Sequence, residues 1–379
     1  CSSLVTVDTP AVEHIGNRCF KNCSKLTSID FSQNVSEIGA AAFAFTSLST
    51  ADFRNATIGN SAFEGSKVVV ARLDKAESLE RTFCECEFLN SVTAPNLKYI
   101  GDFAFYNCKS LNSVNISKVE SVLSYAFSKS AIKTADLPKC SYIGNAVFSR
   151  CDDLYSVNIP LVTKIMPEEF TYCVSLQKIN MPSVEAFDDI SKEYFTDCAS
   201  LEGLYLPKSV NLPSITWSSS MQSSMLFGKR AQLTYVFAPK AVEVASSENV
   251  SFMYKCTKLE YVFLTSVKSL DYIENIDGSV WYFGSETQSL PKLAADKITV
   301  IAPNSSPAIE WAKSNGLSFV ESANITCTSI SANKISYEAL GNEYTLPLNY
   351  VKSLWDTSFV NTKKSGETVS ALLDFNNDN

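Results

Sequence analysis

The sequence has 379 residues, a formal net charge of −8 and an isoelectric point near 5.0. Such an acidic chain lacks the basic surface that attracts nucleic acid or anionic lipid, so we expect neither as a partner. No run of 18 apolar residues is present, and we therefore expect no membrane-spanning segment in this sequence.

One motif repeats along most of the chain, and residues 143–160 show it clearly. There Phe148 is followed at steps of three by Cys151 and Leu154. Steps of about 20 to 23 residues between equivalent positions are typical of leucine-rich-type solenoids, whose coils bury a core only when stacked. The equivalent positions hold Phe20, Phe43, Phe63, Phe83, Phe105, Phe127, Phe148, Phe170, Phe195, Phe227 and Met253. Cys1 is already in phase with this repeat, so we expect any export signal to lie upstream of it.

Each coil should contain one short strand, because the apolar positions of L-x-x-V-x-I alternate with the period of a half-buried strand. The segment I-G-x-x-A-F-x-x-C should form a helical turn on the outer side of the coil. The phenylalanine of this segment is expected to be buried in every coil.

Eight of the twelve cysteines share one position of the repeat. Neighbouring coils lie about 4.8 Å apart, so these side chains would stand side by side, which is poor geometry for a disulfide bond. We interpret them as small buried thiols that pack as apolar groups, with disulfides as the alternative. These eight are Cys1, Cys23, Cys86, Cys108, Cys151, Cys173, Cys198 and Cys256. The four outside this ladder are better candidates for reactive thiols, namely Cys19, Cys84, Cys140 and Cys327.

The positions that flank the buried valine of each strand should point outward and form two columns. One column contains Ser28, Thr50, Ser91, Ser113, Thr134, Ser156, Lys178, Tyr235 and Tyr261. The other contains Asp8, Asp30, Asp52, Thr93, Asn115, Asp136, Asn158, Asn180, Tyr205, Phe237 and Phe263. This face should therefore be polar at its N-terminal end and aromatic at its C-terminal end. The three aspartates are interpreted as a solvated acidic face, with a calcium site as the alternative.

The aromatic end of these columns is the candidate ligand-binding site. Its members are Tyr205, Tyr235, Phe237, Tyr261 and Phe263, together with Trp281 in the insertion 268–297. Clustered exposed aromatic residues mark interaction sites, and sugar rings or an extended peptide could stack on them. In the alternative interpretation, the rest of the chain covers these residues and makes them a second core.

The C-terminal part departs from the repeat. Residues 298–321 should form a strand, a short helix at 307–315 and a last strand that together cap the open end of the array. Residues 322–379 contain alternating apolar runs at 335–340 and 344–350 and should form a small β-type appendage. Asp374, Asn376 and Asp378 resemble the first half of a calcium loop and are weak metal candidates.

The motifs of common enzyme classes are missing from the sequence. The chain has a single histidine, no G-x-S-x-G elbow and no glycine-rich phosphate loop. We therefore expect a protein that is not an enzyme and that needs no cofactor.

The full motif, I/V-G-x-x-A-F-x-x-C-x-x-L-x-x-V-x-L/I-P, resembles the BspA-type leucine-rich repeat of bacterial and protist surface proteins. The resemblance covers residues 1–321, including the cap, although Thr46, Ser66 and Ser130 replace the cysteine. It implies an α/β solenoid, a leucine-rich-repeat right-handed superhelix with a short strand and a helical turn in each coil. It also implies a secreted or cell-surface protein that binds host protein, matrix or glycan.

Two further functions are compatible with the sequence. The array could be a structural spacer that presents a neighbouring module. It could also be an accessory module of a larger surface or carbohydrate-degrading assembly, which only the calcium-loop resemblance at the C-terminal end favours.

Overall fold

The structure is a computed structural model of the chain. It describes residues 1–212 apart from 10, 32–33, 190–191 and 207, and beyond 212 it describes strand segments and residues 238, 241 and 313. Two compact units can be separated. The first consists mainly of Cys1–Ile179 and Lys192–Leu201, and the second mainly of Asn180–Ser191, Glu202–Trp217 and Met221–Asn379.

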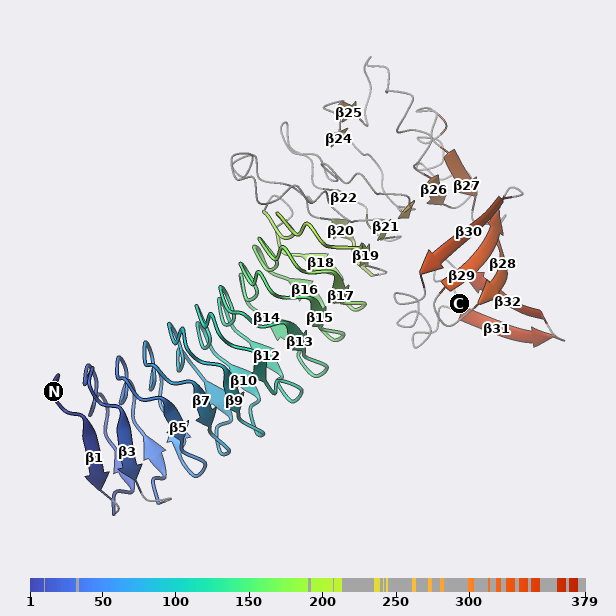
Figure 1. The fold of residues 1–379 in the computed structure, drawn as a ribbon. Helices are drawn as coiled ribbons and strands as arrows, with labels where there is room; N and C mark the ends of the chain where they lie inside the picture. Colours follow the sequence, from blue (N-terminus) through green and yellow to red (C-terminus); the bar gives the residue numbers. More distant parts are fainter. Residues whose placement is uncertain are drawn as a thin grey trace. The chain divides into compact units, whose positions relative to one another are not determined.

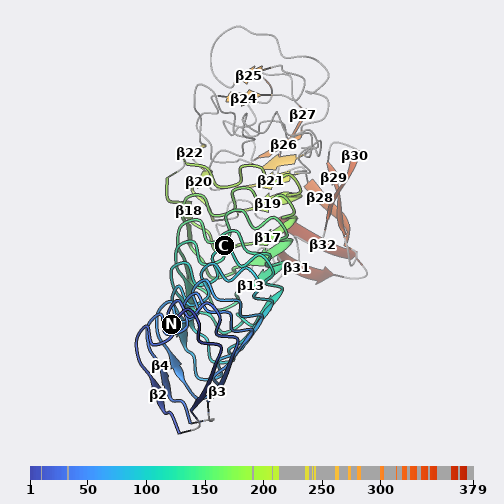
Figure 2. The same ribbon diagram turned by 60° about the vertical axis from the view of Figure 1, so that its left-hand side comes forward.

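The first unit is a stack of coils, each with a longer strand on one side and a shorter strand on the other (Figures 1 and 2). The longer strands, which form the long-strand face, are β1 (Thr6–Thr9), β3 (Ser28–Phe31), β5 (Thr50–Asp52), β7 (Val70–Arg72), β9 (Ser91–Thr93), β11 (Ser113–Val114), β13 (Thr134–Asp136), β15 (Ser156–Asn158) and β17 (Lys178–Asn180). These are the strands that the L-x-x-V-x-I pattern predicts.

The shorter strands form a second face that the sequence did not predict. They are β2 (His14–Ile15), β4 (Glu37–Ile38), β6 (Thr57–Ile58), β8 (Ser78–Leu79), β10 (Tyr99–Ile100), β12 (Ser121–Val122), β14 (Tyr142–Ile143) and β16 (Lys164–Ile165). We call this the short-strand face. On both faces, each strand pairs in parallel with the equivalent strand of a neighbouring coil, for example β5 with β7 and β10 with β12.

A column of phenylalanine rings fills the centre of the first unit, as the repeat predicts. From Phe43 to Phe195, every ring in this column is at most 1% exposed. Neighbouring rings are stacked with centroid distances from 5.2 Å, between Phe105 and Phe127, to 6.1 Å, between Phe148 and Phe170. Because each ring packs against the rings of two neighbouring coils, the core is continuous along the stack.

The predicted helical turn is wrong, because the described residues of 1–212 contain no helix. The segment between the short strand and the cysteine position is a series of tight turns, which we call the turn face. In nearly every coil, the residues two places before and two places after the column phenylalanine have a positive φ angle. They are Arg18, Asn22, Ala41, Phe45, Ser61, Gly65, Arg81, Glu85, Phe103, Asn107, Tyr125, Lys129, Ala146, Arg150, Glu168, Tyr172 and Asp197. A right-handed helix cannot continue through such residues.

The turn face is instead held by hydrogen bonds between coils. Phe20 N donates to Ala42 O at 2.8 Å, and Asn22 N donates to Ala44 O at 2.9 Å. The intervening Lys21 N donates within its own coil, to Arg18 O. Left-handed φ angles at residues other than glycine cost about 1–2 kcal/mol each, and the bonds to the next coil offset this cost by satisfying the backbone groups.

The second unit contains a parallel sheet in the order β19, β21, β23, β26 and β27. Its strands and short-strand partners are β18 (Ala186–Phe187), β19 (Gly203–Tyr205), β20 (Asn211–Leu212), β21 (Tyr235–Phe237), β22 (Glu243–Val244), β23 (Tyr261–Phe263), β26 (Thr299–Ala302) and β27 (Ser318–Glu321). The last two strands confirm the two strands predicted for the cap. The helix predicted at 307–315 lies outside the described residues, except for Lys313.

The remaining strands of the second unit are antiparallel. An unpredicted hairpin in the insertion 268–297 is formed by β24 (Tyr272–Glu274) and β25 (Val280–Tyr282). The C-terminal strands are β28 (Ile325–Ile330), β29 (Lys334–Ala339), β30 (Asn342–Pro347), β31 (Val360–Ser365) and β32 (Thr368–Leu373). The β character predicted for 322–379 is therefore present, with β29 and β30 close to the two predicted apolar runs. The domain boundary at residue 321 stays a prediction.

Replacing Phe105 by alanine should cost about 3–5 kcal/mol of unfolding free energy, because it leaves a cavity between two stacked rings. The control is Phe88→Ala, since the Phe88 side chain is exposed and its loss should change stability by about 0.5 kcal/mol or less. Urea unfolding followed by circular dichroism measures both. Equal losses in the two variants would contradict the ring column as the core.

Candidate functional site

The outward columns of the long-strand face lie where the sequence places them. Asp8 pairs in register with Asp30, and Asp136 with Asn158. The Asn158 side-chain amide donates to Asp136 Oδ1 at 2.7 Å, which links two coils on this face. Because one side chain of each coil occupies each column, the face is a row of positions that can vary without disturbing the core.

One coil of this face, the coil of β7, was missed by the sequence analysis. Val70 of β7 lies between Thr50 and Ser91, and Arg72 lies between Asp52 and Thr93. The leucine of the motif is replaced there by Val68, so the run of three valines hides the strand pattern. Two signals could have revealed the coil of β7. Thr50 and Ser91 are separated by the length of two coils, and Phe63 of the intervening coil is in the ring column.

Arg72 is the one basic residue in its column from β1 to β19. The adjacent Asp52 accepts hydrogen bonds from Arg54 Nε and Nη2, both at 2.9 Å. The hydrogen bonds from Arg54 hold the pKa of the Asp52 carboxyl below its usual value, with smaller contributions from the charges of Arg54 and Arg72. Among the described residues, the Arg72 guanidinium has no hydrogen-bond or ion-pair partner.

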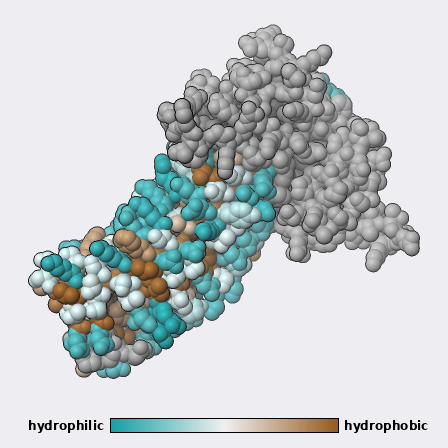
Figure 3. Space-filling view, in the orientation of Figure 1, coloured by the Kyte–Doolittle hydropathy of each residue, from teal (hydrophilic) through white to brown (hydrophobic). Residues whose placement is uncertain are grey.

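Apolar side chains are exposed on the coil of β7 and on the coil that follows it. Val69 and Val70 are 40% and 41% exposed, and Phe88 of the next coil is 54% exposed. Asn90 N donates to Val69 O at 2.8 Å, so the segments that carry these side chains run side by side. Figure 3 shows apolar surface gathered on the visible face of the N-terminal coils among polar side chains. We call Val69, Val70, Arg72 and Phe88 the β7 patch.

The aromatic columns predicted as the ligand site are in register along the backbone. Tyr205 is paired with Phe237 and Phe237 with Phe263, while Tyr235 is paired with Tyr261. The Tyr205 side chain is buried, and burial raises the pKa of its hydroxyl. Tyr205 therefore does not present a surface to a ligand in this conformation.

The side chains of Tyr235, Phe237, Tyr261 and Phe263 lie outside the described residues, so their role stays a prediction. The same holds for Trp281, whose backbone belongs to β25 and pairs with Ile273 of β24.

The metal candidates of the sequence are not tested by the structure. Asp374, Asn376 and Asp378 lie outside the described residues. In the part of the chain that the structure describes, no three histidine, cysteine, aspartate or glutamate side chains are grouped as metal ligands. The same part contains no helix with the length and apolar character needed to cross a bilayer.

The turn face carries aromatic and basic side chains that bind one another. Arg81 lies over the ring of Phe103 at 5.1 Å, and Arg150 lies over Tyr172 at 4.2 Å. Phe103 also stacks on Tyr125 with a centroid distance of 5.1 Å. These contacts join successive coils, so they stabilise the stack and leave few free groups for a partner.

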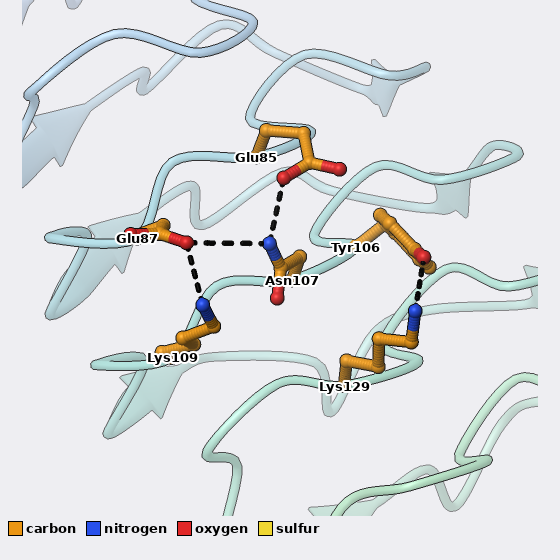
Figure 4. A network of polar contacts seen from close by, with 6 residues as sticks. All are labelled: Glu85, Glu87, Tyr106, Asn107, Lys109 and Lys129. Atoms are coloured by element: carbon orange, nitrogen blue, oxygen red, sulfur yellow. Dashed lines mark hydrogen bonds and ion pairs between the residues drawn. The ribbon is translucent and has the colours of Figure 1, made fainter.

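A polar network joins three coils on the same side of the molecule (Figure 4). The Asn107 amide donates to Glu85 Oε2 at 2.6 Å, and Lys109 Nζ lies 2.6 Å from Glu87 Oε1. In the next coil, Lys129 Nζ donates to the Tyr106 hydroxyl at 2.7 Å. This network is exposed, so solvent screens its charges and it contributes little to stability.

From Cys23 to Cys198 the cysteine ladder is buried as predicted, whereas Cys1 is exposed and Cys256 lies outside the described residues. Five of the buried thiols also act as hydrogen-bond donors. Cys108 Sγ donates to Phe83 O of the preceding coil at 3.1 Å, and Cys173 Sγ donates to Phe148 O at 2.9 Å. The same bond is made by Cys86, Cys151 and Cys198. Burial raises the pKa of these thiols, to about 12 for Cys86 and Cys151. The ladder is therefore structural, because a nucleophilic cysteine needs its thiolate form.

The prediction of reactive thiols outside the ladder is wrong for Cys84 and Cys140. Both are buried, and burial raises the pKa of each to about 11. Cys140 takes the place of an aliphatic residue before β14, and its thiol donates to Tyr142 O at 3.1 Å. Cys19 is exposed, although burial and the nearby Cys23 raise its pKa as well. The side chain of Cys327 lies outside the described residues.

Glu169 is a buried acid that the sequence analysis did not single out. It occupies a core position that is alanine in four other coils, and it is fully buried. Its Oε2 accepts a hydrogen bond from Val147 N at 3.2 Å, whereas Oε1 has no partner among the described residues. Burial raises the pKa of this carboxyl well above its usual value, so it is held in the neutral form.

A family model for the BspA-type leucine-rich repeat region matches residues 1–69 and 79–202 in six copies, which is more than half of the chain. The chain belongs to the BspA-type leucine-rich repeat family. The matched ranges leave out residues 70–78, which include β7 with Val70 and Arg72 of this BspA-type chain.

Three solved structures of leucine-rich repeat proteins are similar to this BspA-type chain. One from Bacteroides ovatus has 21% identity and a TM-score of 0.43, covering 69% of this chain and 79% of its own. A leucine-rich cell surface protein from Faecalibacterium prausnitzii has 20% identity, a TM-score of 0.38 and coverage of 69% and 82%. One from Eubacterium ventriosum has 16% identity, a TM-score of 0.38 and coverage of 76% and 86%. A comparison with curated proteins found no match.

The thiols can be distinguished by alkylation. In the folded chain at pH 8, iodoacetamide should modify the exposed Cys19 while Cys86, Cys108 and Cys173 stay unmodified, because burial holds them as thiols. All four should react after unfolding, as measured by peptide mass spectrometry. Modification of Cys108 in the folded chain at the rate of Cys19 would contradict the buried ladder.

Glu169→Gln should stabilise the protein increasingly as pH rises. The raised pKa means that the folded state holds a proton that the unfolded state releases above about pH 4.3, so the wild type loses stability from that pH upward. At neutral pH the gain should be about 1–3 kcal/mol. The control is Glu168→Gln at the exposed neighbouring residue, which should leave the pH profile of urea unfolding unchanged. A profile of Glu169→Gln parallel to the wild type would show that Glu169 is not a buried neutral acid.

Proposed function

We propose that this chain is a non-catalytic recognition protein, secreted or attached to the cell surface, which binds a partner protein on its long-strand face. The observation that carries the proposal is the β7 patch, where Arg72, without a hydrogen-bond or ion-pair partner among the described residues, shares a strand with the exposed Val70 and the next coil carries the exposed Phe88. The BspA-type family and the cell-surface description of one similar structure support the location.

The apolar part of the β7 patch supports a protein partner. Val69, Val70 and Phe88 project from adjacent coils of a rigid stack, so their positions are fixed before binding. Burying apolar surface contributes about 25 cal/mol per Å², and less ordering of the binding site is needed when its side chains are already placed. Aromatic residues and arginine are also the types that dominate the binding energy of protein interfaces.

The charge of the β7 patch specifies the partner further. Arg54 is committed to Asp52 through two hydrogen bonds, whereas the donors of Arg72 remain available. An arginine fork binds a carboxylate through two parallel hydrogen bonds. We therefore expect a partner segment in which an aspartate or glutamate lies close to an aliphatic or aromatic side chain.

The polar columns on either side of the patch complete the surface. They offer exposed hydroxyl and amide groups, such as those of Thr50, Thr93 and Asn115, which lie on three different coils. Such groups form the polar rim that surrounds the apolar centre of a protein interface. An array of this kind can follow an extended partner over several coils without any change of its backbone.

The test is a binding screen of the full chain against a panel of purified extracellular host proteins, including matrix proteins, by biolayer interferometry. For a protein that binds, Arg72→Ala and Phe88→Ala should each weaken the affinity about 30-fold, the loss of about 2 kcal/mol typical of a central interface residue. Arg72→Lys should recover only part of the loss, because lysine cannot form the two parallel bonds.

Matched controls exist on the turn face. Arg18 and Phe45 are exposed there, so Arg18→Ala and Phe45→Ala remove the same side-chain types from a different surface. Both controls should keep the wild-type affinity. A partner whose binding depends on the controls as much as on the β7 variants would contradict the long-strand face as the site, and a panel without any bound protein would contradict the proposed function.

A further inference from the structure

Two tyrosines occupy the outward column of the short-strand face in alternate coils. Tyr99 of β10 is in register with Ser121 of β12, and Ser121 is in register with Tyr142 of β14. Tyr99 is 46% exposed and Tyr142 is 49% exposed. The two rings therefore stand in one line on the surface, with a small polar residue between them.

The spacing of the two tyrosines follows from the sheet. Paired strands lie about 4.8 Å apart, so the backbones of Tyr99 and Tyr142 are separated by about 10 Å. Ser121 leaves the space between them open, and the exposed Leu123 of the same coil borders it. This arrangement is a flat platform with an aromatic side chain at each end, and we call Tyr99, Ser121, Leu123 and Tyr142 the tyrosine platform.

The ring of Tyr99 is held in place across two coils. Its hydroxyl donates to Glu120 Oε2 of the following coil at 3.4 Å. Because the bond crosses from one coil to the next, it ties the exposed side chain of Tyr99 to the coil of Ser121. On the neighbouring coil, the thiol of Cys140 donates to Tyr142 O and so fixes the backbone that carries the second ring.

The charged groups next to Tyr99 have partners within the protein. Lys98 Nζ lies 3.2 Å from Glu77 Oε2, and Glu120 accepts the bond from Tyr99. The lysine next to Tyr99 is therefore committed to an ion pair, in contrast to Arg72 of the β7 patch. The described surroundings offer hydroxyl and carboxylate groups that exchange hydrogen bonds with an uncharged polar ligand.

We propose that the tyrosine platform binds a neutral oligosaccharide chain. Each tyrosine ring stacks on the apolar face of a sugar ring, and the distance between the tyrosines is comparable with the length of two sugar units in an extended chain. The hydroxyls of the bound sugars exchange hydrogen bonds with Ser121, Glu120 and the Tyr142 hydroxyl. This site is separate from the β7 patch, since it lies on the short-strand face and the patch lies on the long-strand face.

A sugar chain fits the platform better than a protein segment does. The apolar contacts are two separate rings and one leucine, with the polar Ser121 between the rings, whereas the centre of a protein interface is continuous and apolar. A carbohydrate presents alternating apolar faces and hydroxyl groups, which match that alternation.

The test is a glycan array probed with the full chain, followed by isothermal titration with neutral hexasaccharides of glucose, xylose and N-acetylglucosamine. We expect binding of at least one neutral chain, which should change little between 50 and 500 mM salt because no ion pair is formed. Tyr99→Ala and Tyr142→Ala should each weaken the binding about tenfold or more. Tyr99→Phe and Tyr142→Phe should retain most of it, because they keep the rings.

The matched control is Tyr155→Ala, which removes an exposed tyrosine from the long-strand side and should leave sugar binding unchanged. Circular dichroism checks that every variant is folded. The proposal is overturned if no neutral glycan binds, if only acidic glycans bind, or if binding survives in Tyr99→Ala and Tyr142→Ala. Because the β7 patch is unaltered in these variants, the result is independent of the outcome for the protein partner.

Discussion

The stacking of each coil on the next is the interaction on which the rest of the structure depends. A single coil has a strand of two to four residues on each side and one phenylalanine, which is too little to bury a core. Stacking pairs both strands, continues the ring column and lets the turn-face amides donate to the following coil. It also brings each ladder thiol within reach of a phenylalanine carbonyl of the coil before it. Removing one of these contacts weakens two neighbours at once, so the array is expected to unfold as a unit.

Because the inward residues form the core, the outward positions can vary without disturbing it. The inward residues are fixed by the ring column, whereas one side chain of each coil on each strand face is restrained only by its neighbours in the same column. On the turn face these side chains pair with each other, as Arg150 does with Tyr172. On the described strand faces, two places expose side chains that we propose as binding sites, the β7 patch with Arg72 and the tyrosine platform with Tyr99 and Tyr142. A rigid stack presents both with fixed spacing, which is the property that a recognition surface needs.

The features that could be predicted from the sequence are those that recur at a fixed step. The ring column, the cysteine ladder and the outward columns all repeat in phase, so the sequence locates them without knowledge of the turns. The prediction of a helical turn was wrong because residues such as Arg18 and Tyr125 have left-handed φ angles that their residue types do not indicate. A glycine at these positions would have indicated such an angle. These angles are imposed by the neighbouring coil, whose carbonyls take the amide hydrogens that a helix would have used.

The candidate sites were missed for the opposite reason, since they are departures from the repeat. Because Val68 replaces the leucine of the motif, the strand that carries Val70 and Arg72 was not recognised. Tyr99 and Tyr142 lie on two-residue strands, which are too short to be predicted from the sequence. The buried acid Glu169 is likewise a single exception in a column of small apolar residues. The aromatic site expected around Tyr205 was inferred from a real column, but the structure shows that Tyr205 is buried.

Amide hydrogen exchange across the first unit tests the central claim most directly. If the turn face is held by bonds between coils, the amides of Phe20, Asn22 and Phe105 should exchange as slowly as those of the long strands, because all open only when neighbouring coils separate. The residues involved are in turns, so ordinary surface loops would exchange far faster. Rapid exchange along the turn face beside protected strands would contradict the account, because the coils would then be joined by their strands alone.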